Sequence, residues 1–96
     1  MATGTIPRGP ASFGFPTAIS IGSGKNLNDY TSTGFYSWGN APTNAPNSRT
    51  NCVMLVIGFG AANAIQFVFA RANDAAVQTR SYVNGTWSSW ANVKVS

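Results

Sequence analysis

A chain of 96 residues with six Lys or Arg, two Asp, no Glu and no His carries a net charge of +4, although only 8% of it is charged. This length allows one small domain. The single cysteine, Cys52, excludes an intramolecular disulfide and, without histidine, a metal cluster. The start of the chain has no apolar signal segment and no run reaches the length of a membrane span, so we expect no membrane insertion.

Residues 1–24 contain three of the five prolines and five glycines, a density that neither a helix nor a central strand tolerates. Apolar residues nevertheless recur at Ile6, Phe13, Phe15 and Ile19. We therefore predict an extended arm that docks on a partner or a neighbouring subunit and a domain boundary after Gly24. A disordered leader is the alternative.

Residues 25–51 begin with a short helical turn at 27–30, which Asn26 can cap, and Gly34 then allows a strand at 35–38. Repeated Asn-Ala-Pro sequences predict an irregular loop at 39–51. The apolar run at 52–59 is typical of a central strand. Residues 63–71 alternate between two sets of mostly apolar side chains, so we expect a strand that is largely buried on both faces.

Asn73-Asp74 predicts the next turn, and Asn84-Gly85 predicts a two-residue type I′ hairpin loop, because both of its central positions need positive φ. In that register Tyr82 faces Trp87, and Arg80 shares their face and can cover the Trp87 ring. Trp90 falls on the opposite face unless a bulge intervenes.

These elements predict a mainly β, small α+β fold: an antiparallel meander with one short N-terminal helix, in one compact domain over residues 25–96. Structural positions in this fold are Leu27, Gly34, Arg80, Asn84, Gly85, Trp87 and Trp90.

Catalysis lacks suitable side chains, because acid–base chemistry draws mainly on His, Glu and Asp. Asp29 and Asp74 could form a glycosidase pair, but each lies in the setting of a structural cap or turn. Cys52 begins an apolar strand with no histidine to activate it, which favours an inert core thiol. We expect no enzyme, no cofactor and no metal.

The cations are scattered singly, whereas a nucleic-acid binder concentrates them on one face, so we expect no nucleic-acid partner. The aromatic rings and amides of the chain suit a carbohydrate ligand better than a nucleic acid, because rings stack on sugar rings and amides bind hydroxyls. For Trp87 we favour a core role, whereas Trp38, at the start of the Asn-rich loop, is open to either role. The candidate ligand-binding residues are Trp38, Tyr36, Asn40, Asn44, Asn47 and Arg49.

The order of motifs resembles the pyocin knob domain of R-type pyocin and phage tail fibres. The resemblance covers about residues 25–94 and leaves the first 24 residues outside it. It is carried by Leu27-Asn28, Gly34-Phe35-Tyr36, Asn44-Ala45-Pro46, Leu55-Val56, Ile65-Gln66, Arg80 and the final Gly85-Thr86-Trp87-Ser88-Ser89-Trp90.

The resemblance implies a homotrimeric knob on a virion appendage that contacts bacterial surface polysaccharide. Such a protein is assembled in the host cytoplasm and exposed on the particle, and residues 1–24 would attach the knob to other virion proteins. Two alternatives stay open: a purely structural capsid decoration or fibre connector, and a free lectin-like carbohydrate-binding protein.

Overall fold

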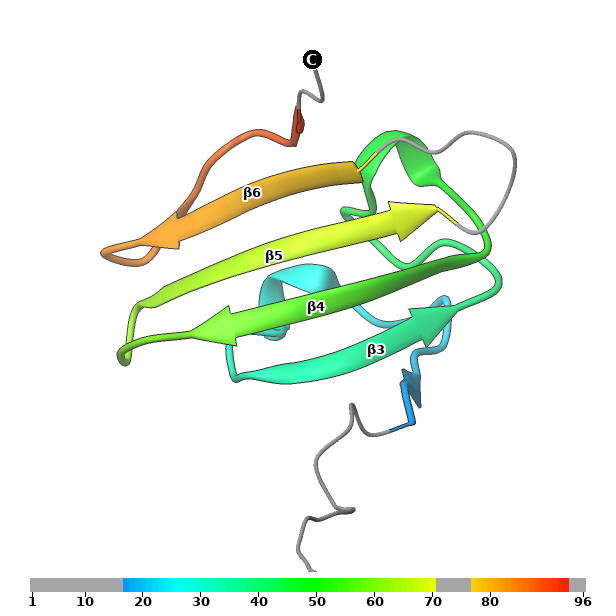
Figure 1. The fold of residues 1–96 in the computed structure, drawn as a ribbon, viewed down its shortest axis with the longest axis horizontal. Helices are drawn as coiled ribbons and strands as arrows, with labels where there is room; N and C mark the ends of the chain where they lie inside the picture. The colour runs from blue at the N-terminus through cyan, green and yellow to red at the C-terminus, as the bar shows by residue number, and fades with distance from the viewer. Residues whose placement is uncertain (1–16, 71–76, 94–96) are drawn as a thin grey trace, which may run out of the picture.

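The computed structural model describes residues 17–70 and 77–93, which form one mixed β-sheet (Figure 1). Its strands lie in the order β2-β3-β4-β5-β6-β7, and β8 pairs with β6 beside β7. The strands are β2 (Ile19–Ser20), β3 (Gly34–Trp38), β4 (Cys52–Gly58), β5 (Asn63–Ala70), β6 (Val77–Val83), β7 (Thr86–Trp87) and β8 (Ala91–Asn92). Two 3-10 turns, η1 (Leu27–Asp29) and η2 (Pro46–Ser48), complete the elements.

The mainly β fold is confirmed, and strands β3 to β6 pair as the predicted antiparallel meander. Two details differ. Strand β2, inside the segment expected to be an extended arm, runs parallel to β3, so the sheet is mixed. The predicted helix is only the 3-10 turn η1, because Tyr30 leaves helical geometry at φ −101° and ψ 84°. The Asn26 cap is present: its Oδ1 accepts a hydrogen bond of 2.9 Å from the Asn28 N–H.

The two faces of the sheet have different environments. On β4 and β5 the even-numbered residues are buried, as at Met54, Val56 and Val68, except Gly58 and Ala70 at the strand ends, because loops and turns cover this inner face. The odd-numbered residues of both strands point to the other side, which we call the outer face, and none of them is buried. The prediction that β5 is buried on both faces is therefore met on the inner face only.

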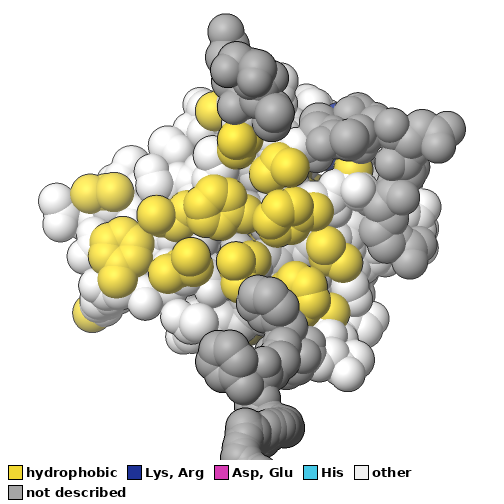
Figure 2. All heavy atoms as spheres, in the orientation of Figure 1, with side chains coloured by type: hydrophobic (Ala, Val, Ile, Leu, Met, Phe, Trp, Pro, Cys, Tyr) yellow, Lys and Arg dark blue, Asp and Glu magenta, His cyan; other side chains and the backbone are white. Residues whose placement is uncertain are grey.

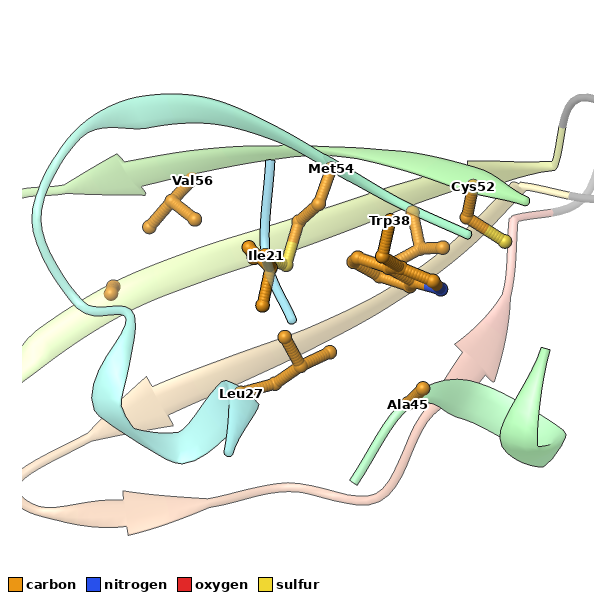
Figure 3. Close-up of a cluster of buried hydrophobic side chains, with 9 residues drawn as sticks. Ile21, Leu27, Trp38, Ala45, Cys52, Met54 and Val56 are labelled. Carbon is orange, nitrogen blue, oxygen red and sulfur yellow. The ribbon is translucent and has the colours of Figure 1, made fainter. Parts of the chain in front are cut away.

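The core lies between the inner face and the segments that cross it. Figure 3 shows Ile21 and Leu27 packed toward Met54 and Trp38, with Ala45 at one end of the cluster. Leu27 is completely buried, and burial of such a side chain stabilises the fold by about 1.5–3 kcal/mol. An isolated parallel β-bridge between Asn26 and Thr43 joins the segment before η1 to the loop that follows β3.

The predicted domain boundary after Gly24 falls inside this core. Ile21 is only 4% exposed, and its N–H donates to the Ser37 carbonyl at 2.8 Å, next to the pairing of β2 with β3. Ile19, predicted to dock on a partner, is exposed on β2. The other predicted arm residues, Ile6, Phe13 and Phe15, lie outside the described residues, as does the turn expected at Asn73-Asp74.

The hairpin register is confirmed. Tyr82 pairs with Trp87, and both loop residues have positive φ, 51° at Asn84 and 85° at Gly85, as a type I′ turn requires. Beyond Trp87 the strand carries one extra residue, because Thr79 pairs with Ala91 instead of Trp90. This bulge corrects the simplest expectation for Trp90, whose ring lies over Arg80 on the inner face.

Gln66 connects the sheet to the layer that covers it. Its side chain is fully buried, and its Nε2 donates to the carbonyls of Leu27, at 2.7 Å, and Tyr30, at 2.9 Å. Its Oε1 accepts a hydrogen bond of 2.9 Å from Arg80 Nε. One amide thus pairs with carbonyls at both ends of η1 and with the Nε of a buried guanidinium, where each unpaired group would cost about 1–3 kcal/mol.

We predict that Gln66→Leu lowers the free energy of unfolding by about 3–5 kcal/mol, because it removes the hydrogen bonds that Gln66 makes to the carbonyls of Leu27 and Tyr30 and to Arg80 Nε. Gln78→Leu is a matched control on the neighbouring strand. Gln78 is 4% exposed, and its Oε1 has no hydrogen-bond partner among the described residues, so its replacement should be close to neutral or stabilising. Urea unfolding of both variants checks this, and equal losses would contradict it.

Candidate functional site

The Asn-rich loop, residues 39–51, connects β3 to β4 and is held closed by its own backbone. The Asn51 N–H donates to the Gly39 carbonyl at 2.7 Å, which joins the two ends of the loop. Three asparagines adopt left-handed geometry, with φ of 69° at Asn44, 51° at Asn47 and 56° at Asn51. Asparagine tolerates this region better than most residues, so the backbone conformation of the loop alone can account for these three asparagines.

Trp38 belongs to the core. Its side chain is 3% exposed, and its Nε1 donates to the Arg49 carbonyl at 2.8 Å across the base of the loop. Of the two roles left open for this ring, the structure favours the core role. The physical reason is the register: Trp38 pairs with Cys52 and shares the inner face with it, where the loop closes over both.

The other predicted ligand residues separate into two groups. Asn40 and Asn47 are exposed on the loop, and Arg49 beside them is half-buried. Asn44 is exposed but structural: its Nδ2 donates to Asn26 Oδ1 at 2.8 Å, and its carbonyl accepts from Trp90 Nε1 at 2.8 Å. Tyr36 lies away from this loop, edge-on to Tyr30 with ring centroids 5.0 Å apart.

An open pocket of about 430 Å³ lies where β2 meets the start of the loop. Its lining includes Thr17, Ser20 and Ser37 together with Trp38 and Gly39. The hydroxyl-bearing residues come together because β2 runs parallel beside β3, placing Ser20 opposite Ser37. Proline and glycine in the first residues hid this strand from sequence reasoning, so these pocket residues were missed.

Arg80 is the central residue of an aromatic cluster on the inner face. Its guanidinium carbon lies 3.9 Å from the Trp87 ring centroid and 4.7 Å from that of Trp90, which confirms the predicted contact with Trp87. Burial lowers the pKa of Arg80 to about 10, so the group remains charged at neutral pH. Arg80 itself is only 6% exposed, the two indoles over it are half-buried, and the cluster is suited to holding β6 to the C-terminal segment.

The described part of the chain offers little reactive chemistry. It contains no group of three or more His, Cys, Asp or Glu that could hold a metal ion, and no helix in it is long and apolar enough to cross a membrane. Cys52 is completely buried, with its thiol 3.4 Å from the Thr50 carbonyl oxygen. Asp29 is exposed on η1, and Asp74 lies outside the described residues.

Comparisons of the chain with protein-family models, with curated proteins and with solved structures returned no match. The resemblance to the pyocin knob therefore stays a prediction from the order of its motifs.

We predict that Trp38→Ala lowers the free energy of unfolding by about 3–5 kcal/mol, because it empties a buried ring site. Trp38→Phe keeps a ring and should cost less than the alanine variant. Chemical denaturation of both variants provides the measurement. A loss below about 1 kcal/mol for the alanine variant would show that the ring does not support the core.

The lowered pKa of Arg80 predicts a pH dependence of stability. As the pH rises through about 10, the folded chain releases this proton while the unfolded chain still binds it, so the free energy of unfolding should rise with pH there. Arg80→Met removes the group. The stability difference between wild type and variant, measured in urea as pH rises above 9, should shift in favour of the wild type, and a constant difference would refute the assignment.

Proposed function

We propose that this chain is a knob domain of a phage tail fibre or a similar virion appendage. It acts as a homotrimer and contacts bacterial surface polysaccharide through the Asn-rich loop. The protein is assembled in the host cytoplasm and exposed on the particle. Two kinds of support favour this proposal: the order of sequence motifs and the construction of the loop.

The loop is the observation that carries the binding part of the proposal. A primary amide has two N–H donors and a carbonyl acceptor, which matches the mixed donor and acceptor character of sugar hydroxyls. Asn40 and Asn47 expose such amides on a loop whose backbone is tied at both ends by the Asn51–Gly39 and Trp38–Arg49 hydrogen bonds. A loop that is ordered before binding loses less entropy when it binds.

The neighbouring pocket adds hydroxyl-bearing residues to this surface. Thr17 and Ser20 line it beside Gly39, the first residue of the loop. A sugar residue held by the amides could extend a neighbouring residue into this pocket, which favours an oligosaccharide over a single sugar. Arg49, half-buried on the loop, would add a positive charge for an acidic polysaccharide.

A purely structural role, as a fibre connector or capsid decoration, is the second candidate. The observation that favours it is the outer face of the sheet, where Phe67 and Phe69 are only half-buried and would suit contacts with other subunits. In both candidates residues 1–16 would attach the domain to other virion proteins. A free lectin-like protein is the third possibility, and it would be a monomer.

The test of binding is a screen of purified protein against bacterial cells and their extracted polysaccharides. For a polysaccharide that binds, we predict that Asn47→Gly weakens binding at least about tenfold by removing one amide, a loss of about 1.4 kcal/mol. Glycine tolerates the left-handed backbone at this position, φ 51°, so the loop should keep its shape. Calorimetry measures the affinity.

Asn84→Gly is the matched control for this experiment. Asn84 is also exposed, has the same φ of 51°, and lies in the β6–β7 hairpin loop, at the end of the sheet away from η2 in Figure 1. The Asn84→Gly variant should bind the polysaccharide with the affinity of the wild type. Unchanged affinity in Asn47→Gly and in Asn40→Ala would overturn the loop assignment, and the absence of any binding in the screen would favour the connector role.

A further inference from the structure

The outer face of the sheet is apolar over its four longest strands. Figure 2 shows hydrophobic side chains in a band across this side of the molecule, with no charged side chain inside the band. The cross-strand pairs on this face are largely apolar, including Phe35 with Leu55, Leu55 with Phe67, and Ile57 with Ile65. The large apolar residues of the face are Phe35, Val53, Leu55, Ile57, Ile65, Phe67, Phe69, Val77 and Val83.

Among the described residues, this face is less covered than the inner face. None of its side chains on β4 and β5 is buried, Ile57 is 41% exposed, and Val83 is 50% exposed. An antiparallel sheet with one solvated face normally alternates apolar and polar residues, whereas strands that are apolar on both sides belong to sheets with both faces covered. Strands β4 and β5 have the second pattern, which indicates that something covers the outer face in the functional state.

The charge pattern favours other copies of this chain as the cover. Around a symmetry axis, a side chain near the axis meets its own copies, so a charged residue there would face the same charge. Across β3 to β6 the polar residues of the face are small and uncharged, as at Ser37, Thr79 and Ser81. Such a face can meet itself without electrostatic repulsion.

The outer face is also large enough for a specific interface between copies of the chain. Strands of about seven residues and a width of four strands give a face of about 23 Å by about 19 Å, or about 440 Å² in projection. The accessible area of a corrugated surface exceeds its projection. The smallest specific interfaces bury about 500 Å² on each partner, so this face, with its rim, reaches the size of a stable contact.

We propose that the outer face of β3 to β6 is the surface through which copies of this chain associate, with each sheet turning this face toward the symmetry axis. This inference deepens the assembly part of the proposed function, because it names the interface of the homotrimer. Phe67, near the middle of β5, lies between Leu55 and Thr79 and is thus central to the contact.

The experiment is a mass measurement by sedimentation equilibrium on the full chain at tens of micromolar concentration. The wild type should have the mass of three chains of 10.1 kDa each. Phe67→Asp should have the mass of one chain, because it places a charge at the centre of the contact. Ile57→Asp, at a position that is already 41% exposed, should do the same with less effect on folding. Asn92→Asp adds the same charge at an exposed position on β8 and should keep the wild-type mass.

The outcomes separate this inference from the proposed function. A wild-type mass of one chain, or a folded Ile57→Asp variant with the wild-type mass, overturns the interface. If the wild type has the mass of one chain, residues 1–16 or an unrelated protein would be left to cover the face. A wild-type mass of two chains that falls to one in Ile57→Asp supports the interface and contradicts the threefold assembly. Circular dichroism confirms that each variant is folded, and glycan binding plays no part in these measurements.

Discussion

The position of Gln66 is the constraint on which the rest of the structure depends. A buried primary amide in the centre of a sheet is acceptable only when its polar atoms have partners, and here the partners come from three separate places in the chain. Two carbonyls of η1 and the guanidinium of Arg80 converge on it. The amide therefore fixes where the covering layer sits on the sheet, which an apolar side chain in its place could not do.

The cluster around Arg80 stabilises a buried guanidinium in a chain that has few carboxylates to pair with it. A buried guanidinium usually pairs with a carboxylate, but the chain has only two aspartates. The charge is instead balanced by the Gln66 carbonyl oxygen on one side and by the faces of two indoles on the other. Trp90 then donates to the Asn44 carbonyl, so the same network reaches from the sheet through the C-terminal segment to the Asn-rich loop.

The sequence was informative wherever a single residue type decides local geometry. Asn84-Gly85 predicted the hairpin and its register, and the apolar runs predicted β4 and β5 within one residue or two. It was uninformative where side-chain placement depends on contacts far along the chain. Trp38 lies at the end of a strand, and only the pairing with Cys52 shows that the loop folds over it. Gln66 is a polar residue that would ordinarily face water, and nothing local reveals its partners on η1.

The bulge after Trp87 is a similar case. Ser88 and Ser89 give no signal for an extra residue, yet its insertion decides on which face Trp90 lies. The pocket in the candidate site could not be predicted from the sequence either. It depends on β2, a strand of two residues that no periodicity could reveal. The exposed asparagines of the loop, by contrast, could be identified from composition alone.

The short strands at the margins of the sheet have a consequence for how this protein avoids aggregation. Within the described residues, β2 ends one side with two residues, and β7 and β8 end the other with two residues each. Few backbone groups are thus left in a row that could template an incoming strand. The short marginal strands therefore disfavour growth by edge-to-edge addition, the route to amyloid-like polymers, even though the centre of the sheet is strongly apolar.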